Sequence, residues 1–217
     1  SFTLAALTAG LAALLALLLG FAARDGHKLP RLASRVVGLG YAVPGSVIAV
    51  GVLIPVTRLD HLLAGLWQQM TGANPGLILT GGIAALVYAY LARFLAIALQ
   101  TVEAGLGRIT PSMESAARSL GSGPGETLRR VHLPLMRGSL LTASLLVFVD
   151  VMKELPATLV MRPFNFDTLA TQTFTLAADE RLAEASSAAL AIVAVGLLPI
   201  ILLARQISAG RSEVSSC

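Results

Sequence analysis

Long apolar segments separated by short polar ones dominate the chain. Five segments are rich enough in apolar residues to be membrane spans, at residues 2–23, 36–57, 76–98, 138–158 and 185–204. A transmembrane helix needs about 20 predominantly apolar residues. The pattern therefore predicts an all-α fold, a polytopic membrane helix bundle that forms a single domain over residues 1–217. Within the third segment we expect Arg93 to snorkel to the membrane surface.

Basic residues between the segments predict the orientation of the chain. Twelve lie on one side of the expected membrane, namely Arg24, Lys28, Arg31, Arg35, Arg93, Arg108, Arg118, Arg129, Arg130, Arg137, Arg205 and Arg211, against three on the other, Arg58, Arg162 and Arg181. Cytoplasmic loops carry the excess of Lys and Arg. We therefore expect a multi-pass membrane protein with a cytoplasmic C-terminus.

The same count places the N-terminus outside the cell. The chain begins Ser-Phe-Thr, without an initiator Met or a basic leader, and its first apolar run is too long for the core of a signal peptide. We expect residue 1 to be the start of a fragment, with at least one more helix upstream.

A polar stretch interrupts the apolar pattern at about residues 100–137. Thr110-Pro111 is typical of a helix N-cap followed by proline at the first helical position, and Glu114 lies in the first turn, where a negative charge suits the helix dipole. Gly121 can end that helix, and Gly123-Pro124-Gly125 turns the chain. The pattern predicts a short helix with a shallow apolar face, which either docks on another protein or folds back on its own.

The spacing of this stretch resembles a known motif. Ala116-Ala117, Gly121, Val131 and Leu133-Pro134 follow the pattern of the EAA loop in inner-membrane permeases of ABC importers, the binding-protein-dependent transport systems. The first position departs from the pattern, because Ser115 stands where the family usually has Glu, and Glu114 lies one residue earlier. The resemblance implies that these residues form the cytoplasmic contact with a separate ATPase.

Two further segments resemble the ferric-iron branch of these permeases. They are residues 40–51, which include Tyr41, Pro44 and Gly45, and residues 153–170. Thiamine and phosphonate permeases are similar there. Permeases of the ferric-iron type carry two six-helix halves in one polypeptide, and this chain resembles nearly all of the C-terminal half.

The resemblance also implies the partners and the mechanism. The partners are a dimer of ATPase subunits, a second permease half, and a periplasmic or lipid-anchored substrate-binding protein. ATP and Mg²⁺ are bound by the ATPase, so the chain itself holds no cofactor and catalyses no covalent reaction. The chain forms the translocation path, which alternates between inward and outward access. The cargo is ferric iron, with thiamine, phosphonate, polyamine or an oxyanion as alternatives.

The fourth apolar segment contains a second group of polar residues. Asp150, Lys153 and Glu154 lie at i, i+3 and i+4, on one face of a helix, and Pro156 follows them. Charges at membrane depth face a bundle interior or water, and proline can break a helix. One interpretation makes these four residues a wall or gate of the translocation path. The other makes Asp150 and Lys153 a structural pair, with Glu154 at the outer interface.

Composition excludes several other functions. The chain is 55% hydrophobic and only 13% charged, with mean hydropathy +0.78, and topology explains its net charge of +4, so nucleic acid is not an expected partner. The Gly121–Gly125 stretch lacks the Gly-Lys-Ser/Thr of an ATP-binding loop. His27, His61 and His132 are isolated and predict no metal site, and one cysteine, Cys217, excludes an internal disulfide. A secondary transporter with a proton relay and an intramembrane hydrolase remain as distant alternatives.

Overall fold

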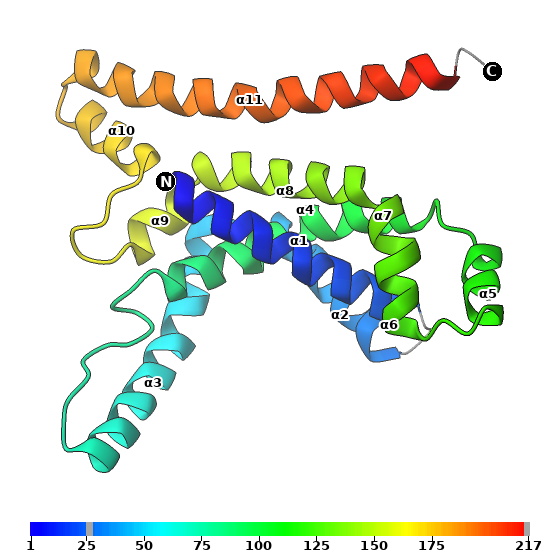
Figure 1. The fold of residues 1–217 in the computed structure, drawn as a ribbon. Coiled ribbons are helices and arrows are strands. Elements are labelled where there is room, and N and C mark those ends of the chain that lie inside the picture. The colour runs from blue at the N-terminus through cyan, green and yellow to red at the C-terminus, as the bar shows by residue number, and fades with distance from the viewer. Residues whose placement is uncertain (25–27, 215–217) are drawn as a thin grey trace.

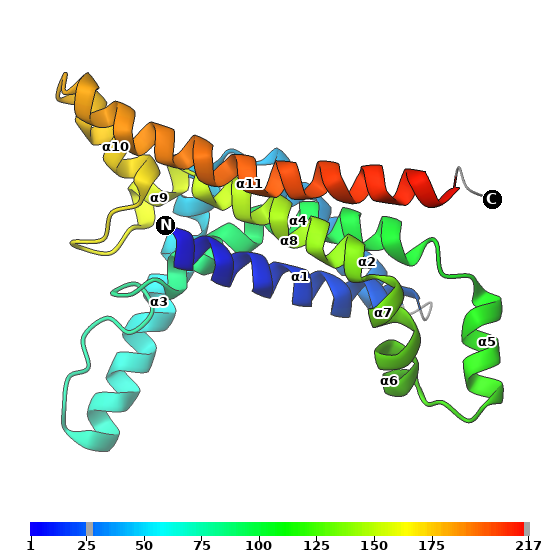
Figure 2. The same cartoon turned by 45° about the horizontal axis from the view of Figure 1, so that its top comes forward.

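A tight group of three helices forms the centre of the protein. The structure is a computed structural model that describes residues 1–24 and 28–214, so His27 and Cys217 lie outside the described residues. Over that part of the chain all regular elements are helical. Helices α1 (Phe2–Arg24), α4 (Ala84–Leu106) and α8 (Arg137–Met152) pack on one another, and they run side by side in Figures 1 and 2.

Small residues allow this close packing. One face of α1 is a stripe of buried Ala5, Ala9, Ala12, Ala16 and Gly20. Stripes of this kind let helix backbones approach closely inside a membrane. At Gly20 the leucine and valine side chains of α4 fill the space, because a Cβ there would meet Leu106 and Val102. The ends of α1 and α4 nearest the polar loop are thereby held together.

The second apolar segment is not one helix, which corrects the expectation for residues 36–57. It divides into α2 (Lys28–Leu39), the 3₁₀ turn η1 (Gly40–Ala42) and α3 (Gly45–Thr71). The cause is Pro44, which drives the preceding residue out of the helical region. Val43 accordingly has φ −84° and ψ 132°. In Figure 1, α3 turns away from the bundle direction that α2 follows.

The third helix also begins later than expected, at Ala84 rather than near residue 76. The loop before it is fastened to α3 by Asp60, whose side chain is fully buried. Its carboxylate accepts backbone hydrogen bonds from Ile78, Leu79 and Thr80 at 2.7, 3.0 and 2.9 Å. Because these backbone groups are satisfied by Asp60, the loop does not need to continue the helix.

The fourth segment, residues 138–158, is likewise not one helix, and it is broken next to the proline that the sequence marks as a helix breaker. Helix α8 ends at Met152, and a separate helix α9 (Pro156–Met161) begins with Pro156 at its first position. Proline is tolerated there because the first N–H of a helix has no intrahelical partner. Pro156 therefore starts a helix.

The C-terminal part is a helical hairpin. Helix α10 (Leu169–Ala178) packs on α11 (Leu182–Val214), which also contacts α8. Figures 1 and 2 show α11 passing along the outside of the bundle. Among the described residues, α1, α3 and α4 are long and apolar enough to cross a membrane by themselves. Helix α8 is too short to cross a membrane by itself. It is long enough only when residues 124–135 are counted with it, and the two parts are bent by 73° relative to each other.

Candidate functional site

The polar loop between α4 and α8 forms two short arms. The first is α5 (Pro111–Ser119), with Thr110 at the N-cap and Pro111 at the first helical position. It ends in a Schellman motif, in which Gly121 and Ser122 donate to the carbonyls of Arg118 and Ala117 at 2.9 and 3.0 Å. Gly121 has φ +83°, a left-handed conformation that favours glycine. Figures 1 and 2 show α5 projecting from one end of the bundle.

The second arm returns the chain to α8. It consists of α6 (Pro124–Thr127), a π-helical turn η2 (Leu128–His132) and α7 (Leu133–Leu135). In the π turn the backbone N–H of Leu133 donates to the carbonyl of Leu128, five residues back. Pro134 has no N–H with which to continue an α-helical ladder, which accounts for the wider turn just before it.

Glu114 joins the two arms to the rest of the protein. Its carboxylate lies 2.8 Å from Nε of Arg24 on α1 and 2.9 Å from Nε2 of His132 on η2. A more exposed cation, Arg118, lies 3.8 Å away. Glu114 is the acidic residue closest in sequence to Ser115, whose own hydroxyl donates to the carbonyl of Pro111 at 3.0 Å.

His132 is fully buried between two acceptors. Its Nδ1 lies 3.2 Å from the carbonyl oxygen of Thr127, and its Nε2 faces Glu114. Both contacts are hydrogen bonds only if both ring nitrogens carry a proton, because a carbonyl and a carboxylate only accept. The edge of the ring packs against Phe21 of α1, with ring centroids 5.0 Å apart.

Arg24 extends the connection to α4. Its guanidinium donates to the carbonyl oxygens of Leu106, the last residue of that helix, and of Ile109, three residues beyond it. A cavity of about 340 Å³ opens between the arms, lined by Arg24, Glu114 and His132 among others. The side-chain network thus connects α5, η2 and the adjacent ends of α1 and α4.

The outer face of the loop is apolar and exposed. Leu120 is 87% exposed and Met113 45% exposed, whereas Ala117 is buried. Ala116 and Gly121 of the first arm are exposed, as are Leu133 and Pro134 of the second, and Val131 is half-buried. Large exposed side chains of this kind mark a binding surface when they gather on one face.

The second candidate group differs from the sequence-based expectation. Asp150 and Lys153 do pair, at 2.8 Å, but Lys153 is 62% exposed. Glu154 is the buried member, only 6% exposed, and its partner is Arg93 of α4, whose Nη1 lies 2.9 and 3.0 Å from the two carboxylate oxygens. Glu154 therefore does not lie at an outer interface.

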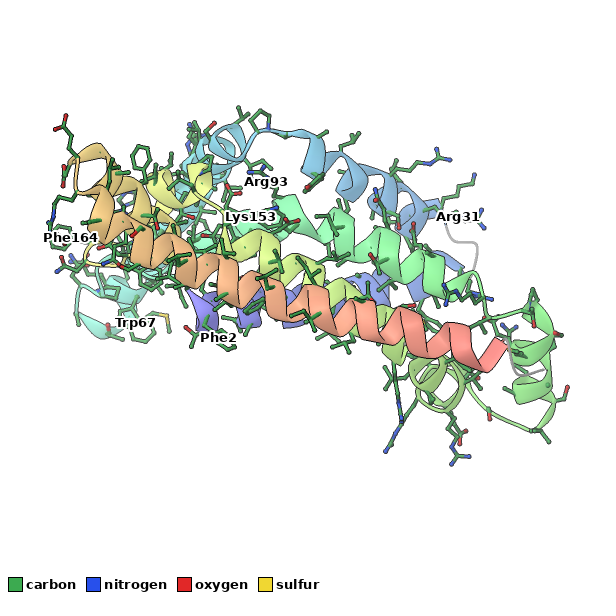
Figure 3. All side chains as sticks on the ribbon, turned by 90° about the horizontal axis from the view of Figure 1, so that it is seen from above. Phe2, Arg31, Trp67, Arg93, Lys153 and Phe164 are labelled. Carbon is green, nitrogen blue, oxygen red and sulfur yellow. The ribbon has the colours of Figure 1, made fainter. Side chains whose placement is uncertain are left out.

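Arg93 lies in the middle of α4, so the expectation that it snorkels to the membrane surface is wrong. Its side chain crosses to Glu154 beside the start of α3. A Cβ on Gly45 would overlap both Nη1 of Arg93 and Oε1 of Glu154. Figure 3 labels Arg93 on α4 and Lys153 at the end of α8. Here the breaks in the second and fourth segments meet.

Further hydrogen bonds hold the second break. The backbone N–H of Ala157 donates to Glu154 at 3.1 Å, and the hydroxyl of Thr158 donates to the Glu154 carbonyl at 2.6 Å. The buried Tyr90 of α4 then donates to Thr158 at 2.5 Å. Glu154 is thus fixed by α4 and by its own segment.

Comparison with known proteins identifies the family. The family described as binding-protein-dependent transport system inner membrane component matches residues 12–211. The chain belongs to this family. The resemblance of the chain to the ABC permeases is thereby confirmed, and the protein is a transport subunit and not itself an enzyme.

Two relatives of this permease differ in the cargo that their names state. A putative 2-aminoethylphosphonate transport system permease protein, PhnV, of Salmonella typhimurium is 31% identical over 209 residues, 93% of this chain and 72% of that protein. An Fe(3+)-transport system permease protein, FbpB 2, of Haemophilus influenzae is 30% identical over 204 residues, 94% of this chain and 37% of that protein. Ferric iron is therefore not singled out among the cargoes.

Solved structures share the fold of the permease. A chain of a bacterial alginate ABC transporter, in complex with a periplasmic protein bound to an alginate pentasaccharide, superposes with TM-score 0.64 at 15% identity. The match covers 93% of this chain and 73% of that one. A second structure of an alginate importer gives TM-score 0.63 at 13% identity. These likenesses support a multi-pass membrane helix bundle.

Sequence analysis of the permease named Arg24, Gly45, Arg93 and His132 but assigned none of them to a site. Gly45 follows a proline inside an apolar segment, which was a usable signal for a break. Arg93 was visible as a lone charge in an apolar helix, a feature that by default marks a functional position. The partners of Arg24 and His132 are distant in sequence. Over the described residues no cluster of three or more His, Cys, Asp or Glu could hold a metal ion.

Proposed function

We propose that this permease subunit forms the translocation path of an ATP-driven importer and receives the motion of a separate ATPase dimer through the 111–134 loop. The observation that carries the proposal is the contact of Glu114 with both Arg24 and His132. A force on α5 reaches the ends of α1 and α4 through charged hydrogen bonds, which are stronger than neutral ones. Met113, Ala116 and Leu120 form the docking face.

The gate of the path is the Arg93–Glu154 pair together with Gly45. The pair lies where α3, α4 and the α8–α9 break meet, and buried charges at such depth face a bundle interior. Opening this pair separates α4 from α9. Lys153, which is 62% exposed, and its partner Asp150 line the approach. A second permease half completes the path, and a binding protein delivers cargo from the outer side.

The first candidate cargo is ferric iron. The named Fe(3+) permease relative supports it, and Asp150 and Glu154 supply carboxylate oxygens, which suit hard cations. The second candidate is 2-aminoethylphosphonate, supported by the PhnV relative. Arg93 and Lys153 supply the cations that bind a phosphonate. The gate holds charges of both signs, so its residues suit either cargo. A measurement of uptake distinguishes the two candidates.

The docking test compares two exposed apolar residues. Leu120→Glu should abolish co-purification of the permease with its ATPase and ATP-dependent uptake in proteoliposomes. Phe164→Glu is the matched control, since Phe164 is 94% exposed and lies away from α5, near the α10 end (Figure 3). Retained ATPase binding in Leu120→Glu, with insertion into the membrane intact, would contradict the docking proposal.

The cargo test uses the complete importer with its own binding protein. Vesicles loaded with ATP receive either radioactive Fe³⁺ or radioactive 2-aminoethylphosphonate. Accumulation of iron alone supports the first candidate, and accumulation of the phosphonate alone supports the second. Uptake of neither cargo, in vesicles that still hydrolyse ATP when the binding protein is added, rules out both.

A further inference from the structure

Helix α2 carries an apolar stripe that the protein itself leaves uncovered. Leu29, Leu32, Val36 and Leu39 are 77, 59, 61 and 66% exposed. Their spacing of three and four residues puts them on one face of the helix. The opposite side packs against α1 and α4. Helix α2 thus presents an apolar surface to whatever surrounds the bundle.

Basic residues border this stripe. Lys28, Arg31 and Arg35 are exposed and lie along one edge of the stripe, because they precede Leu29, Leu32 and Val36 by one position each. Figure 3 labels Arg31, and its Nε lies 3.4 Å from the carbonyl oxygen of Ala23 on α1. Helix α2 follows the end of α1 that contacts the 111–134 loop. A 12-residue helix is about 18 Å long, so α2 covers only the half of the bundle nearest that loop.

A cavity lies between α2 and α4 at the same level. Its volume is about 370 Å³, and its polar lining comes from Arg31, Ser34, Arg35, Gln100 and Glu103. The hydroxyl of Ser34 is buried and has no hydrogen-bond partner among the described residues. An unpaired buried hydroxyl is unfavourable unless a ligand or water satisfies it.

We propose that this cavity binds the headgroup of an anionic phospholipid, with phosphatidylglycerol as the best fit. The two guanidinium groups bind the phosphate, which Arg recognises well because of its planar set of donors. The Ser34 hydroxyl donates to a phosphate oxygen. The carboxylate of Glu103 repels the phosphate, but the two positive charges of Arg31 and Arg35 outweigh its one negative charge. The same carboxylate accepts hydrogen bonds from the glycerol hydroxyls.

The apolar stripe identifies the ligand as a lipid and not a free phosphate. Acyl chains that leave the cavity lie along Leu32, Val36 and Leu39, which are exposed. Basic pockets between transmembrane helices on the cytoplasmic side are known to take anionic headgroups. The ATPase docking face at Leu120 lies on a different element, so this site is separate from the one proposed for coupling.

The test measures lipid retention by the complete permease complex in nanodiscs that contain phosphatidylcholine with or without phosphatidylglycerol. Native mass spectrometry should detect phosphatidylglycerol on the wild-type complex. Each of Arg31→Gln and Arg35→Gln should weaken retention about fivefold, the factor that corresponds to about 1 kcal/mol per basic residue. Arg58→Gln, an exposed arginine on α3, is the matched control and should change nothing.

Three outcomes would overturn the proposal. The first is equal retention in Arg31→Gln, Arg35→Gln and Arg58→Gln. The second is displacement of the lipid by millimolar glycerol phosphate, which would indicate a site for a soluble phosphate. The third is efficient cysteine cross-linking of position 32 or 36 to the second permease half or the ATPase, which would assign the stripe to a protein interface. Retention is measured without transport, so the result is independent of the cargo and coupling proposals.

Discussion

Glu114 and His132 are separated by 18 residues along the chain, yet the carboxylate of one lies 2.9 Å from Nε2 of the other. The contact closes the 111–134 loop near its two ends. His132 is fully buried, so its ring has a fixed position against which Glu114 is held. The arms α5 and η2 are therefore one unit and do not move as two independent segments.

Replacement of Glu114 tests this unit. Glu114→Ala leaves His132 buried without its acceptor, which costs about 1–3 kcal/mol, so the loop should loosen and cargo transported per ATP hydrolysed should fall. Arg118→Gln is the control, because Arg118 is 68% exposed and 3.8 Å away and exposed pairs contribute about 0–1 kcal/mol. An unchanged transport ratio in Glu114→Ala would show that the loop does not act through this residue.

Gly121 and Gly123 form a matched pair. A Cβ at either position meets no neighbour, but only Gly121 has a positive φ, +83°, whereas Gly123 has φ −73°. Gly121→Val should strain the end of α5 by about 1–2 kcal/mol and abolish transport while membrane insertion survives. Gly123→Val should transport normally. Normal uptake and normal ATPase association in Gly121→Val would contradict the role of α5 in coupling.

The buried pair at Glu154 should respond to single and double substitutions in opposite ways. Arg93→Met or Glu154→Gln alone breaks a buried pair, which typically costs about 3–5 kcal/mol when one charge is stranded, whereas loss of both is closer to neutral. The amount of folded protein in the membrane should fall in Arg93→Met and recover in the double variant.

Asp150 and Lys153 give the comparison for that experiment. Lys153 is 62% exposed, so Lys153→Met should lower protein abundance little. If the buried pair is a gate, the recovered Arg93→Met/Glu154→Gln protein should hydrolyse ATP without coupled uptake. Wild-type uptake in the double variant would remove Arg93 and Glu154 from the path.

Gly45 offers a steric test of the same site. Gly45→Ala places a methyl group on the Arg93–Glu154 pair, so either the pair or the start of α3 must shift. Gly51→Ala, on the same helix but with open space around its Cβ, should be neutral or slightly stabilising, because alanine favours a helix over glycine by about 1 kcal/mol. Thermal unfolding in detergent should separate the two variants, and equal melting temperatures would argue against close packing at position 45.

The orientation of the protein is tested by labelling. In the full-length protein with Cys217→Ser, a cysteine at Ser122 should react with a membrane-impermeant maleimide only from the cytoplasm. A cysteine at Thr71, at the exposed end of α3, should react only from outside. The reverse pattern would overturn both the orientation and the docking of the ATPase at α5.

The limits of the sequence argument follow from distance along the chain. The end of α5 was predictable because the signal, Gly121, is local. The breaks near Pro44 and Lys153 are signalled only by Pro44 and Pro156, because average hydropathy stays high across both of them. Arg93 and Glu154 lie 61 residues apart, and no local pattern pairs them. A charge whose partner is distant looks like a snorkelling side chain.

The hydrogen bonds from Arg24 to the carbonyl oxygens of Leu106 and Ile109 affect how α1 and α4 can move. Because Arg24 joins the two helix ends, α1 and α4 tilt together as one rigid body and do not bend independently. Each has 23 residues and is about 35 Å long, so a tilt of about 5° at the loop end moves the far end by about 3 Å. Glu154 and Gly45 touch Arg93 partway along α4, where a smaller displacement is enough to break a hydrogen bond.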